Sequence, residues 1–362
     1  MRFSCLVALV CVMFAGGAQA ASPMIQAYKA YLAALDQGDI VTADREGEKA
    51  WKAAEEANNK KYSAILAYNL AELRLRYLPH ADVKTPAKRA FVLTKTADNP
   101  GLTVQSTQLI FGLSAFMDKP NKNTRRSLKW AMKAYDAAQL KPSYPVFRSH
   151  FELMKDASYN QDWRTTRAEA KAALDVYKAL EMNAPSALAS VKLFDASAVL
   201  IQSDFKNIRE AEEDLQAIFD ALGPQRYDHP NKLFLAAWAW GQAAKAMQYS
   251  RHTSKGRILD TSLPPETGRP ETCQPINWIK KEKPQYPPKM LKKGYVGAAI
   301  VQYSLGQDGV PKEVNLAAEV PMTKFGKYAA DAVREWRATP MPGVPSACRD
   351  YIKANFIFML EK

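Results

Sequence analysis

Residues 297–316 read Gly297-Ala-Ala-Ile-Val-Gln-Tyr-Ser-Leu-Gly-Gln-Asp-Gly-Val-Pro-Lys-Glu-Val-Asn-Leu316. They form two β-rich runs that meet at Gly306-Gln-Asp-Gly309. Asp-Gly between apolar runs is the strongest short-range signal of a β-hairpin, because glycine supplies the positive φ that such turns require. The stretch therefore predicts a hairpin and places a β-sheet in the C-terminal part of the chain.

The residues after the hairpin predict a helix and a final strand. Residues 325–336 carry apolar side chains at helical spacing, which indicates an amphipathic helix. Residues 339–342, Thr-Pro-Met-Pro, then break the chain, because proline cannot continue a helix. Residues 351–360 alternate, and we expect one face of a last strand to carry Ile352, Ala354, Phe356, Phe358 and Leu360.

A short helix is expected before the hairpin. Residues 284–294 begin with proline and end with glycine, as short helices commonly do. The predicted order is therefore helix, strand, strand, helix, strand, with a three-stranded antiparallel sheet.

This order, with its motifs, resembles the C-terminal domain of the TonB family. The motifs are Gln285-Tyr286-Pro287, the strand at residues 297–303, the turn Asp308-Gly309, the pattern Trp336-Arg-Ala-Thr-Pro340 and the strand motif Asn355-Phe-Ile-Phe358. They cover less than a quarter of the chain. The resemblance implies a protein-binding module that captures a short strand, the TonB box, of an outer-membrane receptor.

Carried over by position, the resemblance assigns peptide-binding residues on both sides of the captured strand. Gln285, Tyr286 and Pro287 would lie beside it, and the last strand, with Lys353, Asn355 and Ile357, would supply the free pairing edge. A structural role is the alternative, since Tyr286 and Pro287 also start a helix and the phenylalanines of the last strand suit a core. Proline at the outward-facing position, Lys353 or Asn355, is expected to abolish capture.

The N-terminus has the features of a secretory signal peptide at residues 1–20. Arg2 precedes an apolar run, and Ala18-Gln-Ala20 is the small-residue pattern of a cleavage site. About ten apolar residues are too few for a membrane-spanning helix, which needs about 20. We expect a periplasmic protein that starts at Ala21; the alternative is an N-terminus retained as an inner-membrane anchor.

Export determines which cysteines remain in the mature protein. Cleavage would remove two of the four, which leaves Cys273 and Cys348 at the two ends of the C-terminal domain. An even pair in an oxidising compartment predicts a disulfide. Two free thiols are the alternative.

Residues 21–250 have a helical pattern that repeats. Paired helical segments begin near residues 22, 60, 102, 144, 186 and 230, and proline- or glycine-containing breaks separate them. A period of roughly forty residues is typical of an α-solenoid. The first pair looks like a tetratricopeptide repeat, and we expect five pairs and a capping helix, with the apolar residues 233–240 in a buried last helix.

The domain organisation follows from these segments. Residues 251–275 are rich in proline and glycine and predict a linker. The expected fold is α+β multidomain: a signal peptide (1–20), an all-α tetratricopeptide-like solenoid (21–250), the linker (251–275) and a TonB C-terminal-like domain (276–362).

Catalytic and cofactor motifs are missing from the sequence. It contains no phosphate-binding loop, His-Glu-x-x-His, Gly-x-Ser-x-Gly or cysteine cluster at metal spacing, and has four widely separated histidines. The acidic run at residues 210–214 is typical of a solvated helix face. We therefore expect neither an enzyme nor a metal or cofactor site.

Charge and domain content leave binding as the expected function. The formal net charge of +13 would suit nucleic acid, but export argues against that partner. The lysines at residues 280–293 suit either a solvated face or an anionic cell-envelope partner. The leading hypothesis is a periplasmic adaptor that binds proteins or peptides, including a TonB-dependent outer-membrane receptor.

Two other functions stay open at this stage. One is an energy transducer with a retained anchor, although the chain lacks the anchor histidine and the proline-rich spacer of the family. The other is a cell-envelope protein that binds peptidoglycan or lipid.

Overall fold

The computed structural model describes residues 22–96, 101–202, 208–223, 225–248, 255–260, 266–321 and 324–361. These residues fall into two compact units, 1–152 and 153–362. The predicted signal peptide lies outside the described residues.

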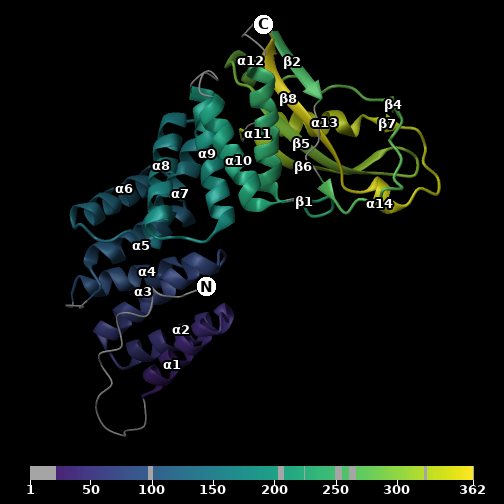
Figure 1. The fold of residues 1–362 in the computed structure, drawn as a ribbon. Coiled ribbons are helices and arrows are strands. Elements are labelled where there is room, and N and C mark those ends of the chain that lie inside the picture. Colours follow the sequence, from purple (N-terminus) through teal and green to yellow (C-terminus); the bar gives the residue numbers. More distant parts are fainter. Residues whose placement is uncertain are drawn as a thin grey trace. The chain divides into compact units, whose positions relative to one another are not determined.

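Eleven helices precede the sheet in this part of the chain (Figure 1), and their starts follow the predicted pairs closely. Their bounds are α1 Pro23–Asp36, α2 Ile40–Glu56, α3 Lys60–Tyr77, α4 Lys84–Thr94, α5 Val104–Asp118, α6 Lys122–Ala137, α7 Tyr144–Tyr159, α8 Trp163–Ala179, α9 Pro185–Gln202, α10 Ile208–Leu222 and α11 Lys232–Gln248. The prediction of a helical region before the TonB-like domain is confirmed.

Polar caps and left-handed residues set the helix ends. Asp39 and Asn59 accept hydrogen bonds from the backbone N–H groups of Thr42 and Tyr62, which would otherwise lack a partner in the first turn. Gly38 and Asn58 adopt positive φ after α1 and α2, as residues that end helices often do. The breaks between helices are therefore encoded locally.

Small residues let the first helices approach closely. Ala43, Ala50 and Ala54 of α2 are fully buried against the aromatic residues of α1. At Gly47 an added Cβ would lie 3.1 Å from the Tyr31 ring. A larger residue there would push α1 and α2 apart.

The C-terminal part of the second unit is built on a four-stranded sheet with the order β2-β8-β5-β6. The remaining elements are β1 Gln225–Arg226, β2 Lys255–Asp260, β3 Glu266–Thr267, β4 Trp278–Lys280, α12 Pro288–Lys292, β5 Gly297–Leu305, β6 Pro311–Val320, α13 Phe325–Arg334, β7 Arg337–Ala338, α14 Ser346–Arg349 and β8 Ile352–Glu361. The predicted three antiparallel strands are β5, β6 and β8.

The predicted hairpin joins β5 to β6. Gly309 has φ +77° and donates its N–H to the Gly306 carbonyl at 2.9 Å. Its own carbonyl accepts from the Ala338 N–H, so the turn also contacts the short strand β7. The Asp308-Gly309 turn thus connects the two strands of the hairpin, as the sequence predicts.

One face of the sheet carries the core of the TonB-like domain. Phe325 and Val333 of α13, Met290 of α12 and Trp336 are buried in it. The Trp336 indole N–H donates to the Glu282 carbonyl at 2.7 Å, which satisfies the polar end of the buried ring.

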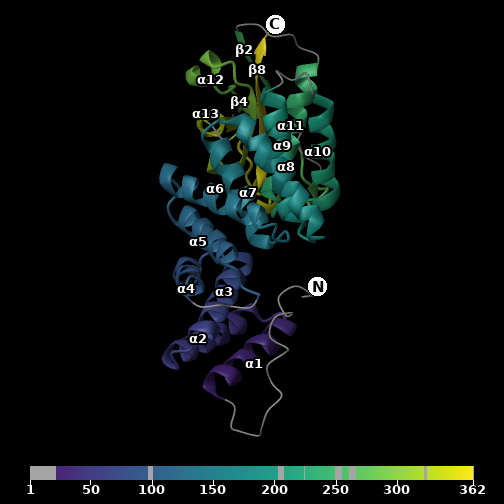
Figure 2. The same cartoon turned by 90° about the vertical axis from the view of Figure 1, so that its left-hand side faces the viewer.

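The other face of the sheet packs on α11, between the strands and α9 and α10 (Figures 1 and 2). Trp240 is fully buried there, and its indole N–H donates to the Ser197 hydroxyl at 2.7 Å. Helix α11 is buried as expected, and it packs against the sheet as well as against α9 and α10.

Residues 251–275, predicted as a linker, contain two strands. β2 pairs with β8 antiparallel, and β3 pairs with β1 parallel. The prediction of a linker was wrong for β2 because a strand joins a sheet through main-chain hydrogen bonds. It needs few apolar side chains to do so.

Candidate functional site

The predicted peptide-binding edge belongs to β8, and the structure places β8 inside the sheet. β5 pairs with residues 352–358 of β8 on one side, and β2 pairs with residues 356–361 on the other. The expectation that the last strand presents a free edge is therefore wrong: the chain's own β2 occupies it. Propensity and alternation identify a strand but do not identify its neighbours, which explains the error.

Lys353 does not point into solvent. Its side chain is only 1% exposed, pairs with the Glu266 carboxylate of β3 and donates to the Tyr227 carbonyl at 2.8 Å. Burial lowers the pKa of Lys353, and the Glu266 hydrogen bond opposes that shift. Lys353 fixes the segment after β2 to the start of β8.

Asn355 and Ile357 are also buried, so they are not outward-facing either. Neither has exposed surface. Ile357 belongs to the same buried cluster as Trp240 of α11. The predicted alternation of side chains along β8 is observed, because Phe356 and Phe358 face α13. The opposite face of the strand packs on a helix and is not exposed to solvent.

Gln285, Tyr286 and Pro287 lie just before α12. Gln285 is exposed, whereas Pro287 is buried. The Tyr286 ring contacts Phe325 and Phe358 at centroid distances of 5.9 and 5.7 Å, and its hydroxyl donates to the Tyr295 carbonyl. Burial raises the pKa of Tyr286. Tyr286 is thus a core residue, and Gln285 is the member of the motif that a partner can reach.

Tyr286, the neighbour of Gln285 in the chain, contacts β8. Phe358, which the Tyr286 ring contacts, is the β8 residue opposite Ile258 of β2. Of the predicted motif, Tyr286 is therefore the residue that the structure brings into contact with the last strand.

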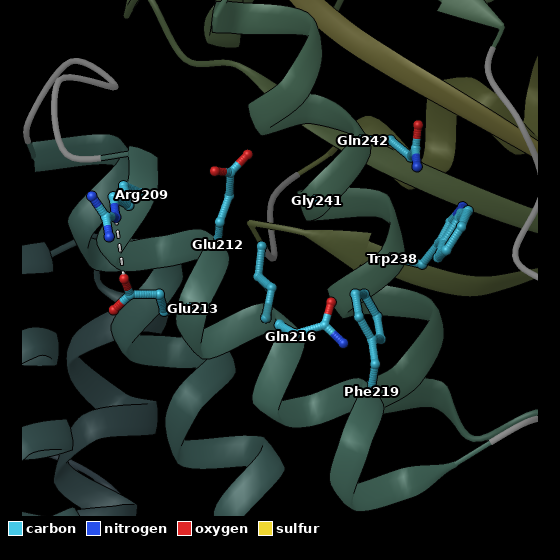
Figure 3. Close-up of a pocket in the computed structure, with 9 residues that line it drawn as sticks. Arg209, Glu212, Glu213, Gln216, Phe219, Trp238, Gly241 and Gln242 are labelled. Atoms are coloured by element: carbon cyan, nitrogen blue, oxygen red, sulfur yellow. Dashed lines mark ion pairs between the residues drawn. The ribbon is translucent and has the colours of Figure 1, made fainter.

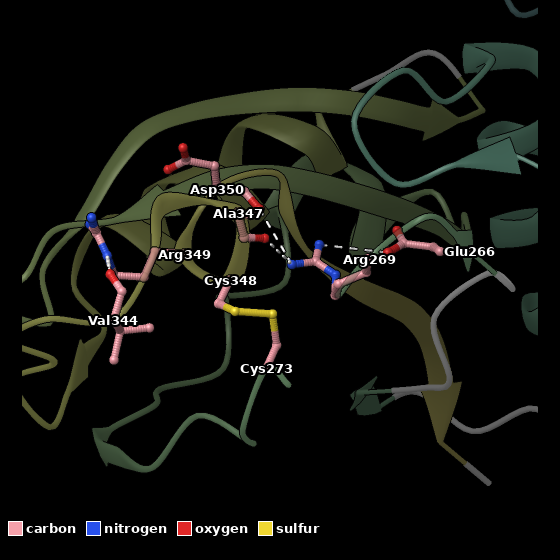
Figure 4. The surroundings of a disulfide bond; sticks show 8 residues. All are labelled: Glu266, Arg269, Cys273, Val344, Ala347, Cys348, Arg349 and Asp350. Carbon is pink, nitrogen blue, oxygen red and sulfur yellow. Dashed lines mark hydrogen bonds and ion pairs between the residues drawn. A yellow bond between two sulfur atoms is a disulfide. The ribbon is translucent and has the colours of Figure 1, made fainter. Parts of the chain in front are cut away.

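The predicted disulfide between Cys273 and Cys348 is confirmed, and Figure 4 shows its surroundings. The Arg269 guanidinium lies nearby and donates to the carbonyls of Ala347, Asp350 and Tyr351 at 3.1–3.5 Å. The disulfide, Arg269 and the Lys353–Glu266 pair together hold residues 266–273 against residues 347–353. We call this set of contacts the latch.

The lysines near α12 are largely exposed, including Lys283, Lys289 and Lys292. The Lys281 ammonium lies 5.0 Å from the centre of the Trp336 ring, and the Lys293 ammonium donates to the Gln161 side chain at 2.9 Å. Part of this charge therefore has a packing role within the second unit.

A cavity lies between α10 and α11, lined in part by the acidic run 210–214 and residues 233–240, which were predicted as a solvated face and a buried helix (Figure 3). It has a volume of about 410 Å³, and Gly241 gives it room because an added Cβ would meet only Leu215, at 3.9 Å. Phe219 and Trp238 line it from the two helices, with ring centroids 6.0 Å apart. Its rim includes an exposed ion pair between Arg209 and Glu213.

The described ranges contain neither a metal-binding cluster nor a membrane-spanning helix. Within them, no group of three or more histidine, cysteine or acidic residues could hold a metal ion. Among the same residues, no helix combines the length and apolar character that crossing a bilayer requires.

Comparison with known proteins supports the resemblance of the C-terminal part. Residues 282–358 match the family model of the Gram-negative bacterial TonB protein C-terminal domain. A comparison with curated proteins finds no match for the chain. The matched residues include β5, β6, α13 and Gln285, and they begin after β2 and the cysteine at 273. β2 therefore lies outside the matched residues.

Proposed function

We propose that this protein is a non-enzymatic protein-interaction adaptor of the bacterial cell envelope. In this proposal the TonB-like domain binds an extended segment of an outer-membrane transport protein, and the helical region binds a second protein. The observation that carries the proposal is the family match at residues 282–358, with the helix–strand–strand–helix–strand order intact.

Strand capture is the mode of binding that suits this sheet best. An added strand binds through main-chain hydrogen bonds, and neighbouring side chains select among partners. Gln285 is exposed beside Tyr286, whose ring contacts β8, and this supports Gln285 as a residue that contacts the bound strand. The helical pairs supply the extended surface that repeat proteins use for binding.

A second candidate function is supported by the exposed lysines near α12. Lys283, Lys289 and Lys292 would suit an anionic cell-wall polymer or lipid. Transduction of energy with a retained N-terminal anchor remains a third proposal. The first residue of the protein purified from its host, determined by mass spectrometry, separates it from the periplasmic proposal, which expects Ala21.

In-cell photo-crosslinking tests the leading proposal. A photoreactive residue replaces Gln285 in the full chain, and the matched control carries it at Lys327, an exposed residue of α13 in the same domain. The expected result is a crosslink to an outer-membrane transport protein from position 285 and not from 327. The same products from both positions, or crosslinks to peptidoglycan alone, would contradict the proposal.

A further inference from the structure

The edge of β8 that the proposed function requires is already paired within the chain. The register of β2 and β8 runs from Lys255 opposite Glu361 to Asp260 opposite Phe356, six consecutive antiparallel pairs. Residues 356–358 of β8 are therefore paired on both sides, with β2 and with β5. A second strand cannot use the same backbone groups while β2 is in place.

The opposite edge of the sheet, β6, is less suited to an added strand. Its pairing with β5 contains two register shifts, and Glu313 adopts a φ of +51°. Bulges and charged residues such as Lys312 and Glu313 are the usual means by which proteins protect edges from further pairing. The regular ladder of backbone hydrogen bonds is the one between β2 and β8.

The strand β2, which pairs with this edge of β8, lies outside the residues that match the family model. In the sequence, β2 precedes residue 282 and lies between α11 and the TonB-like domain. Its sequence, Lys-Gly-Arg-Ile-Leu-Asp, has two large apolar residues among charged ones. Strand addition tolerates such a sequence, because its affinity comes mainly from backbone hydrogen bonds.

The latch keeps β2 near its site. Glu266 pairs with Lys353, Arg269 donates to three carbonyls at residues 347–351, and Cys273 is bonded to Cys348. Only residues 261–265 separate β2 from the first of these contacts. A short tether gives an intramolecular strand a high effective concentration, so it competes strongly with a strand in solution.

We infer that β2 is the chain's own occupant of the β8 edge at residues 356–361, the edge at which the proposed function requires an extended partner segment to bind. A partner binds by displacing β2, while the latch stays closed and keeps β2 close enough to return. This inference rests on the proposed function and adds to it an autoinhibitory strand.

The test uses the full chain and needs no envelope partner. The probe is a fluorescein-labelled peptide of residues 253–262. Two variants, Ile258→Pro and Leu259→Pro, weaken β2 in the chain. Adjacent residues of a strand direct their N–H groups to opposite edges, so one variant loses a hydrogen bond to β8 and the other is its matched control.

We expect one of the two variants to bind the probe about tenfold or more tightly than the unaltered chain, because its acceptor site is open. The probe carrying the same proline should not bind that variant. If both variants are folded by circular dichroism and neither binds, the inference is wrong. Equal binding to all three chains would also overturn it, since the probe would then be using the outer edge of β2 or another surface.

If the variants do not fold, hydrogen exchange of the unaltered chain tests the inference instead. The inference predicts slow exchange of the alternate amides in residues 255–260 that face β8, together with amides in residues 356–361. Fast exchange throughout 255–260 would overturn it. Because no transport protein takes part, failure here with an intact crosslink from Gln285 would remove the role of β2 and leave the proposed function standing.

Discussion

Asp195 shows how a single buried carboxylate changes the response of the second unit to pH. It lies on α9 and is 4% exposed, with the Arg167 Nε at 3.8 Å. Burial, and then the neighbouring Asp214 carboxylate, raise the pKa of Asp195 from 3.8 to about 6, although Lys171 and Arg167 oppose the shift. This burial could not be predicted from the sequence, because an aspartate within a helical pattern is usually exposed.

The raised pKa has a defined consequence for stability. The folded state binds more protons than the unfolded state between pH 3.8 and about 6, so the contribution of Asp195 to stability is largest at low pH and is lost as the pH rises through about 6. Asp195→Asn should therefore raise the free energy of unfolding by about 1–3 kcal/mol at pH 7.5 and change it little near pH 4. Denaturant unfolding at both values measures the difference.

The exposed Asp175 of α8 provides the matched control, since Asp175→Asn should have little effect at either pH. A loss of stability in Asp195→Asn at both pH values would contradict the interpretation. It would mean that the ion pair with Arg167 outweighs the cost of burial.

At the scale of the element, the β5–β6 turn depends on a close approach as well as on its dihedral angle. Gly309 and Gly343 have nearly equal φ values, +77° and +78°. An added Cβ at Gly309 would lie 2.1 Å from the Ala338 carbonyl oxygen, whereas at Gly343 it would meet nothing within 4 Å. Both positions strain an alanine, but only the first also produces a collision with the backbone.

Gly309→Ala should therefore lower the free energy of unfolding by about 3 kcal/mol or more, and Gly343→Ala by about 1 kcal/mol. Chemical denaturation of both variants tests this comparison. Equal losses would mean that the turn moves away from β7 at little cost, and that the close packing of the hairpin on β7 is not needed.

The elements that the sequence predicts well are those with local signals. The Asp308-Gly309 turn, the stripe of α13 and the starts of the helix pairs are all found where expected. The pairing of β2 with β8 was missed because it depends on backbone contacts between residues about a hundred positions apart. Gln285 is exposed, as a partner-binding residue must be, whereas Lys353 and Asn355 are buried, because their exposure depends on which segments cover β8.

The sequence of β5 carries a signal that both of its faces are buried. Residues 297–301, Gly-Ala-Ala-Ile-Val, are buried without alternation. A strand that is apolar on both faces is typical of a sheet covered on both sides. That pattern, beside the apolar residues 233–240, could have predicted that the last helix packs on the sheet.

At the scale of the molecule, the helical region and the TonB-like sheet share a core in the second unit. Seven apolar residues of the sheet and its approach pack with α9, α10 and α11. They are Val296, Ala298, Ile300, Ala318, Val320, Ile357 and Met359. The TonB-like domain is therefore not a module on a free linker, and a partner that binds β8 binds a unit that includes the last helices.

Thermal unfolding of two fragments tests this shared core most directly. Residues 143–362 keep α7 to β8, and residues 251–362 keep β2, the cysteine pair and the whole sheet but lose α11. We predict one cooperative transition for the longer fragment. For the shorter one we predict no cooperative transition, because its loss of α11 exposes one whole face of the sheet. Cooperative unfolding of residues 251–362 at the temperature of the longer fragment would contradict the shared core.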